Sequence, residues 1–129
     1  MVHLEDGRAI KPEEVLAAPD PVLSYAYCSD TRYNPELVDY IKDTLLLYHE
    51  ATFLQDLKAR ADETWHSTAK EAATIARDSN VKKLLIGHYS ARYRDLAPLV
   101  AEAQEIFPHV EAAREGQVFN LKEVAKAHV

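Results

Sequence analysis

The chain contains a single cysteine, Cys28, and no apolar run long enough to cross a membrane. One cysteine excludes an internal disulfide and fits a reducing compartment. The longest apolar run, residues 81–87, includes two lysines, whereas a membrane span needs about 20 apolar residues. The first residues lack a basic region followed by an apolar one, so we expect no signal peptide, no membrane contact and a cytoplasmic location.

Positive charge is also scarce, since 15 lysines and arginines face 21 acidic residues and give a net charge of −6. Nucleic-acid-binding proteins are usually basic, so a broad nucleic-acid surface is disfavoured, although a nuclease could still grip RNA locally. The sequence also lacks a GxGxxG motif, a P-loop, a CxxC pair and a nucleophile elbow. With 47% hydrophobic residues, the 129 residues fit one globular domain, residues 1–129.

Apolar runs alternate with amphipathic segments after a proline-rich stretch at residues 11–21. Such alternation predicts an α/β layered fold with a partly parallel sheet. We expect strands at residues 22–29, 44–48 and 81–87, a short last strand at 117–121, and helices at 35–42, at 67–78 and after Asp95.

Potentially reactive side chains follow the three central strands. Asp30 comes after the first strand, His49 and Glu50 end the second, and His88 follows the third. Parallel strands gather such residues at one edge of the sheet, where ligands of α/β proteins bind. Neighbours on a strand point to opposite faces, so only one of His49 and Glu50 can face this edge directly.

Asp30 and His88 combine a carboxylate with an imidazole, a pair that suits zinc or another divalent transition metal. Two ligands do not make a zinc site, which needs three or four. The alternative is that Asp30 caps a turn and His88 is a hydrogen-bonded core histidine.

His66, Ser67 and Thr68 stand at the start of a predicted helix, where free N–H groups and the helix dipole favour a phosphate. A histidine there could protonate a leaving oxygen, or it could simply be an exposed loop residue. Ser90 and Arg92 follow His88 closely enough to reach the same phosphate, and surface charge is the alternative for Arg92. Trp65 could stack on a base.

Four segments together resemble ribonuclease Z, the zinc-dependent endonuclease that trims the 3′ end of precursor tRNA. They occur in that family's order and at similar spacings, and the resemblance runs from about residue 6 to residue 120. The HEAT-like and HST-like segments are the most specific of them. The four segments are Tyr27-Cys28-Ser29-Asp30-Thr31-Arg32, His49-Glu50-Ala51-Thr52-Phe53, His66-Ser67-Thr68-Ala69 and Gly87-His88-Tyr89-Ser90-Ala91-Arg92-Tyr93.

The resemblance implies the C-terminal half of a metallo-β-lactamase αββα sandwich, with a mixed sheet flanked by helices. It implies that Asp30 bridges two zinc ions, that His88 binds one of them, and that His66 protonates the leaving 3′ oxygen while Glu50 orients it. Substrate contacts are expected from Ser90, Arg92, Ser67 and Thr68. The expected substrate is precursor tRNA, and the full-length protein is expected to be a homodimer.

The family's HxHxDH motif does not occur in these 129 residues. The resemblance places that motif, a further histidine and the water-activating base in an N-terminal half, so Asp30 and His88 alone leave each zinc short of ligands. Two alternatives stay open: a half-domain that acts only by pairing with a complementary partner, and another phosphodiesterase of the same superfamily. Half a sandwich also leaves an apolar sheet face uncovered, so we expect the chain to associate or aggregate.

Overall fold

The computed structural model describes residues 1–20 and 22–128. Its centre is a four-stranded sheet in the order β3-β4-β5-β6, in which every pairing is parallel. The strands are β3 (Tyr25–Cys28), β4 (Leu46–Glu50), β5 (Lys83–Gly87) and β6 (Val110–Ala112). The predicted α/β layering is therefore confirmed, and the sheet is parallel where a mixed one was predicted.

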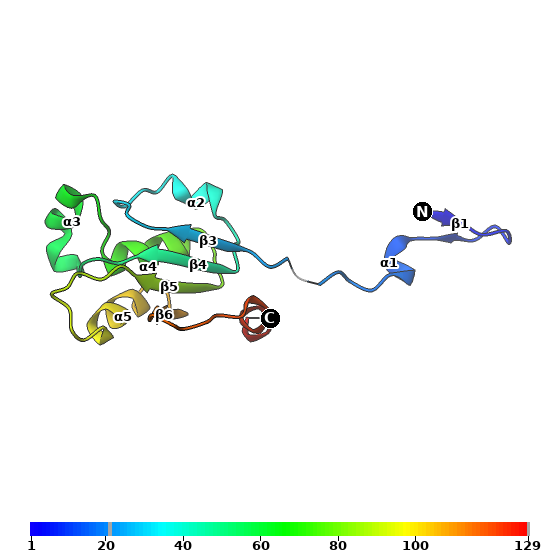
Figure 1. The fold of residues 1–129 in the computed structure, drawn as a ribbon. Helices are drawn as coiled ribbons and strands as arrows, with labels where there is room; N and C mark the ends of the chain where they lie inside the picture. The colour runs from blue at the N-terminus through cyan, green and yellow to red at the C-terminus, as the bar shows by residue number, and fades with distance from the viewer. Residues whose placement is uncertain (21, 129) are drawn as a thin grey trace.

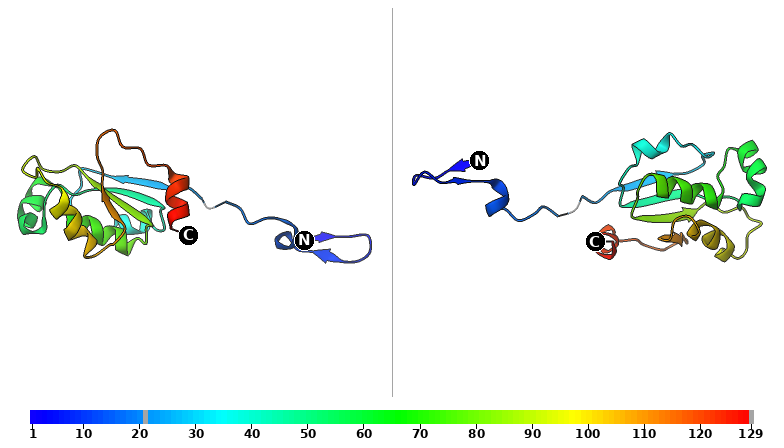
Figure 2. Two further views of the ribbon diagram at one scale, coloured as in Figure 1. Left: turned by 90° about the horizontal axis from the view of Figure 1, so that it is seen from below. Right: turned by 180° about the vertical axis from the view of Figure 1, so that it is seen from behind.

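Helices α2 (Leu37–Tyr40), α4 (Ala69–Asp78) and α5 (Ala97–Gln104) connect the strands in turn. Helix α4 packs against β4, β5, α2 and α5 on one face of the sheet, as the view from behind in Figure 2 shows. Its alanine-rich face is fully buried with Leu47, Leu84 and Ile86. A capping box begins α4, since the Thr68 hydroxyl accepts from the Glu71 N–H while Glu71 accepts from the Thr68 N–H. None of the helices in the described ranges has the length and hydrophobicity that a membrane crossing requires.

The end of the chain differs from the prediction. The last strand is β6, at residues 110–112, and not residues 117–121. Val110 and Ala112 are buried against the helix face and pair with β5. Asn120 instead begins a helix, α6 (Leu121–Ala127), because its side-chain oxygen accepts from the N–H groups of Lys122 and Glu123. The charged composition of this segment hid a helix with a single buried residue, Val124.

Two further elements were not predicted. A 3₁₀ turn, η1 (Gln55–Leu57), and helix α3 (Lys58–Thr64) lead from β4 towards His66. Helix α3 buries only Ala61, so its sequence carries no apolar stripe to reveal it.

Residues 1–20 form a separate arm in which no residue is buried. Strands β1 (Val2–His3) and β2 (Ala9–Ile10) pair as an antiparallel hairpin, and α1 (Pro12–Val15) is a single helical turn. Figure 1 shows the arm apart from the sheet. The grouping of residues 1–129 into one domain stays a prediction.

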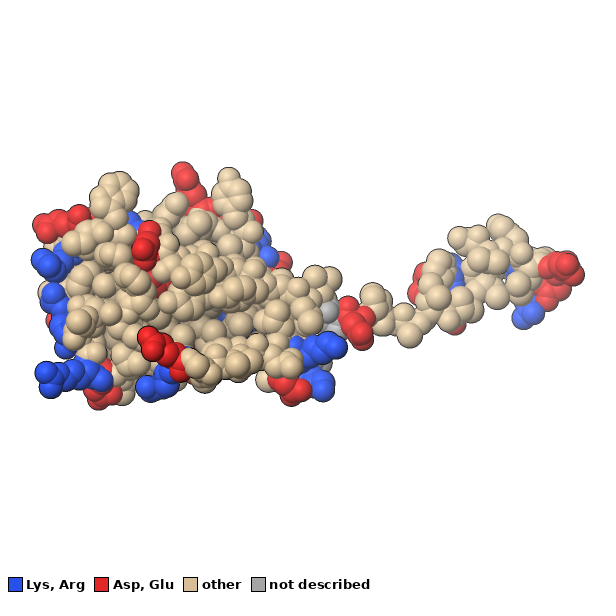
Figure 3. Space-filling view, in the orientation of Figure 1, with Lys and Arg blue, Asp and Glu red and all other residues tan. Residues whose placement is uncertain are grey.

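The sheet face opposite α4 carries aromatic and aliphatic side chains. Tyr25 and Tyr27 are 52% and 64% exposed, and the Tyr27 ring stacks on Tyr48 with centroids 4.7 Å apart. Figure 3 shows few charged atoms over the strands on this side. At one end, Phe119 and Leu121 line a hollow with Tyr25 and other residues of the sheet. The expected uncovered sheet face is therefore present.

Candidate metal and proton-transfer site

Four side chains converge at the carboxyl edge of the sheet. Asp30, Glu50, His66 and His88 each contribute one atom to a group that lies within 4.8 Å of one another. Asp30 follows β3, Glu50 ends β4, His88 follows β5, and His66 lies shortly before α4. The parallel strands thus bring together the residues that the sequence placed at this edge.

Glu50 is the buried centre of the cluster, with no exposed surface. Its Oε1 accepts from the N–H of Thr31 at 2.7 Å and lies 2.8 Å from Nδ1 of His66. Its Oε2 accepts from the N–H of Ser67 at 3.1 Å and from the Thr52 hydroxyl at 2.5 Å. All four contacts come from groups that can donate, so both carboxylate oxygens are occupied and neither is free to bind a metal.

Both ring nitrogens of His88 have a polar partner. Nδ1 lies 2.9 Å from the Thr52 hydroxyl, and Nε2 lies 3.1 Å from Oδ1 of Asp30. The His66 ring stacks on the His88 ring with centroids 4.9 Å apart. The two histidines therefore share one face of the cluster, while Asp30 closes it from the more exposed side.

Asp30, Trp65 and His88 have positive φ angles, of 53°, 61° and 59°. Residues with side chains rarely adopt this left-handed conformation, which costs about 1–3 kcal/mol at each position. The strained turns after β3 and β5 direct Asp30 and His88 towards each other. Asp43 and Asn80 also have positive φ angles away from the cluster, so three of the five such residues lie at or beside it. Backbone strain of this kind is often found at functional sites.

His49 lies on the opposite face from Glu50, as alternation along a strand requires. It is fully buried, and its Nδ1 lies 2.8 Å from the Glu50 carbonyl oxygen. Its Nε2 is buried and has no hydrogen-bond partner among the described residues. Burial lowers the pKa of His49 below the ordinary histidine value, so the ring is a neutral core residue and Glu50 is the one that faces the site.

Ser67 and Thr68 lie beneath the surface next to the cluster. Both are fully buried. The Ser67 hydroxyl donates to the Thr31 carbonyl at 2.6 Å, and the Thr68 hydroxyl donates to Gln55 at 2.6 Å. Their hydroxyls hold the loop and the helix start, and the substrate contact expected from these two residues stays a prediction.

Ser90 and Arg92 remain accessible. The Arg92 guanidinium is exposed, and its Nε donates to the Ser90 hydroxyl at 3.1 Å. The Ser90 N–H donates to the Thr52 carbonyl, which ties this loop to the segment that follows β4. The two residues are therefore linked to the cluster through the backbone of Thr52.

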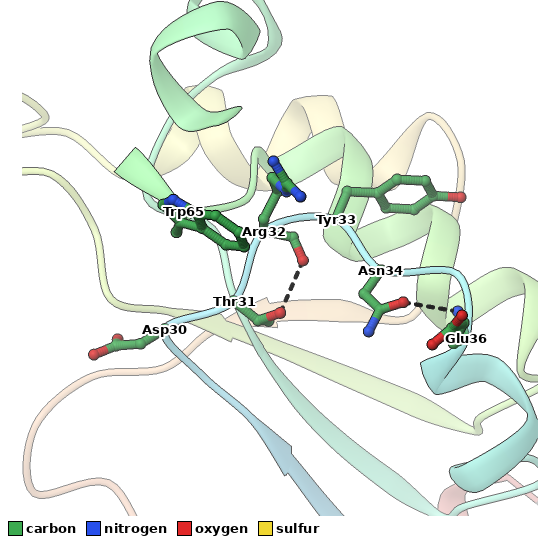
Figure 4. Close-up of a pocket in the computed structure, with 7 residues that line it drawn as sticks. All are labelled: Asp30, Thr31, Arg32, Tyr33, Asn34, Glu36 and Trp65. Carbon is green, nitrogen blue, oxygen red and sulfur yellow. Dashed lines mark hydrogen bonds between the residues drawn. The ribbon is translucent and has the colours of Figure 1, made fainter. Parts of the chain in front are cut away.

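A hollow of about 340 Å³ adjoins the cluster, and Asp30 lines both. Trp65, the only tryptophan, is 64% exposed and lies against Arg32, whose guanidinium carbon is 4.1 Å from the ring centre. Figure 4 shows the two side chains together on one wall of the hollow. Among the described residues Arg32 has no carboxylate partner, so its charge is available to an anion.

The donor set fits part of a metal site. Carboxylate oxygen and imidazole nitrogen are ligands that zinc accepts, and Asp30 Oδ1 and His88 Nε2 face each other. Glu50 is excluded as a ligand by its four donors. Since zinc takes three or four protein ligands, the described residues supply only some of the ligands that a zinc ion needs.

Thr52 is the site residue that the sequence analysis missed. Its hydroxyl contacts both Glu50 and His88. The sequence spacing could have revealed Thr52. Residues i and i+2 of an extended segment point to the same side, and Thr52 follows Glu50 at that spacing. Glycine is required at position 87 for a packing reason. A Cβ there would overlap the Tyr48 phenol, because the Tyr48 side chain already fills that space.

Solved structures identify the fold. The metallo-beta-lactamase fold protein YhfI from Bacillus subtilis is 26% identical, with a TM-score of 0.67 over 72% of this chain and 38% of that one. A long form RNase Z from yeast is 28% identical, with a TM-score of 0.65 over 78% of this chain and 14% of that one. A parallel sheet that carries a metal-type cluster at its carboxyl edge places the chain in the metallo-β-lactamase class.

The particular family follows from curated relatives. Ribonuclease Z of Porphyromonas gingivalis strain W83 is 53% identical over 116 residues, which cover 90% of this chain and 38% of that protein. No family model matches the chain. The chain is homologous to ribonuclease Z over nine tenths of its length, and it spans about 38% of the length of the first curated relatives it matches. The resemblance found in the sequence is confirmed.

Proposed function

We propose that this chain is the C-terminal part of a zinc-dependent endoribonuclease that removes the 3′ trailer of precursor tRNA. The observation that supports this most strongly is the convergence of Asp30, Glu50, His66 and His88 at one sheet edge. The homology to ribonuclease Z supplies the reaction class. We also propose that the enzyme acts in the cytoplasm and that the full-length protein is a homodimer.

Asp30 and His88 are the proposed metal ligands of this chain. Zinc, when bound, supplies a Lewis acid that lowers the pKa of water and offsets charge on the phosphate. Two ligands from this chain are not enough, so the remaining ligands come from the segment of the full-length enzyme that carries HxHxDH. We propose that two zinc ions would be shared between the two parts, and that Asp30 and His88 would be the ligands from this chain.

His66 is the proposed proton donor to the leaving 3′ oxygen. Its Nδ1 is held by Glu50, which leaves Nε2 as the nitrogen able to give a proton. A buried carboxylate behind the ring fixes its orientation, as in other histidine–carboxylate pairs. Ser90 and Arg92 are the proposed contacts to the phosphate, because a guanidinium matches phosphate geometry.

The test is a full-length enzyme in which this chain replaces the matching part of the Porphyromonas gingivalis ribonuclease Z. His66→Ala should lower the rate of 3′-trailer cleavage by about 10²–10⁴-fold, the usual contribution of a general acid. His109→Ala, an exposed histidine outside the cluster, is the matched control. Unchanged cleavage by His66→Ala would remove His66 from the mechanism, and no cleavage by the parent enzyme would count against the whole proposal.

One alternative has structural support. The uncovered sheet face would suit a half-domain that acts only by pairing with a complementary partner. The same experiment separates the two, because a silent half-domain would fail to support cleavage although it joins the other half. Another phosphodiesterase of the same fold would cut a model phosphodiester and spare precursor tRNA.

A further inference from the structure

The Thr52 hydroxyl lies between Glu50 and His88. It is 2.5 Å from Oε2 of Glu50 and 2.9 Å from Nδ1 of His88. Thr52 is only 6% exposed, so water competes weakly for either contact. We propose that Thr52 is a positioning residue that holds the proton of His88 on Nδ1 and keeps Nε2 free for a metal.

The direction of each hydrogen bond follows from counting donors. The N–H groups of Thr31 and Ser67 can only donate, and both point to the Glu50 carboxylate. A threonine hydroxyl has one hydrogen, and the shorter contact, to a carboxylate oxygen, takes it. The hydroxyl oxygen then offers only a lone pair to His88, so Nδ1 of His88 must carry a hydrogen.

The backbone of Thr52 keeps the hydroxyl in place. Its N–H donates to the Ser67 carbonyl at 3.0 Å, and its carbonyl accepts from the Ser90 N–H at 3.0 Å. Thr52 thus joins the segment that carries His66 to the loop that carries His88. One carboxylate, Glu50, orients His66 directly and His88 through Thr52.

The consequence concerns the nitrogen that faces Asp30. With hydrogen fixed on Nδ1, the Nε2 lone pair of a neutral His88 meets Oδ1 of Asp30 at 3.1 Å. Two acceptors this close repel each other, and a cation bound between them removes that repulsion. A hydrogen bond that fixes the tautomer of a ligating histidine is a general feature of metal sites. The metal role of this arrangement depends on the proposed function, whereas the tautomer itself does not.

The experiment reads the tautomer directly in the metal-free 129-residue chain. Two-bond ¹H–¹⁵N correlation spectra of histidine-labelled protein, at about pH 9 and so above the ordinary histidine pKa, separate protonated from unprotonated ring nitrogens. Wild-type His88 should show a protonated Nδ1. Thr52→Val removes the hydroxyl at similar volume, so Asp30 should draw the proton to Nε2 and Nδ1 should become unprotonated. Thr52→Ser should restore the wild-type pattern.

Three results would overturn the proposal: an unprotonated Nδ1 in wild type, a Val variant with the wild-type pattern, or a Ser variant that resembles Val. The wild-type and Ser spectra decide the matter even where the Val variant does not fold. Because no cleavage is measured, a failure here leaves the nuclease proposal standing. A failure of the nuclease proposal likewise leaves the tautomer result intact.

Discussion

Nδ1 of His66 lies 2.8 Å from Oε1 of Glu50, and that carboxylate has no exposed surface. The pair joins His66, whose side chain is 24% exposed, to the last residue of the buried strand β4. Because Glu50 also accepts two backbone N–H groups, it orients His66 and supports the loops around it together.

Glu50→Gln should damage both roles. The amide nitrogen cannot accept, so one buried donor among Thr31, Ser67 and Thr52 loses its partner, which costs about 1–3 kcal/mol of folding free energy. Urea unfolding measures this loss. Glu71→Gln is the matched control, because Glu71 is also buried and glutamine serves equally in a capping box. Equal stability of the two variants would contradict the central role of Glu50.

Trp65 should report RNA binding by its fluorescence. It is the only tryptophan, is exposed, and lies against Arg32 beside the cluster. A base that stacks on the indole contributes about 1–3 kcal/mol and should quench its emission. A short single-stranded oligoribonucleotide should therefore quench the signal, and an abasic strand of equal charge is the control. Equal quenching by both strands would show that only the backbone charge is bound.

The uncovered sheet face should make the isolated chain associate. Tyr27 is 64% exposed and stacks on Tyr48 on this face. Tyr27→Lys places a charge there and should shift the chain towards monomer in sedimentation velocity. Tyr40→Lys is the control, because Tyr40 is 87% exposed on α2. A monomeric wild-type chain would contradict the idea that this face needs a partner.

Acid should destabilise the fold through His49. Burial lowers its pKa, so the unfolded chain takes up this proton more readily than the folded one. The stability is fully present above the ordinary histidine pKa, about 6.5, and is lost as the pH falls through the lower folded value. The free energy of unfolding should fall by up to about 1.4 kcal/mol per pH unit in that range. His49→Asn should show a flatter dependence, and His109→Asn the wild-type one.

The sequence by itself determined the layered α/β fold and the edge at which chemistry gathers. Apolar runs at residues 22–29, 44–48 and 81–87 gave three strands close to β3, β4 and β5. Parallel strands end at the same edge, so the positions of Asp30, Glu50 and His88 could be predicted together. The start of α4 can also be read from the sequence. Its capping residues, Thr68 and Glu71, are only three positions apart, and a cap is a local interaction.

Tertiary structure decided what local patterns cannot encode. Ser67 and Thr68 looked available to a substrate, and packing against residues 31 and 55 buried them instead. The chain end gave a helix, α6, where a strand was expected, because β6 took its place beside β5. Thr52 became part of the site because folding brings His88 beside it, across 36 residues of sequence. Hydrogen bonds over such separations depend on the three-dimensional arrangement of loops and not on local periodicity.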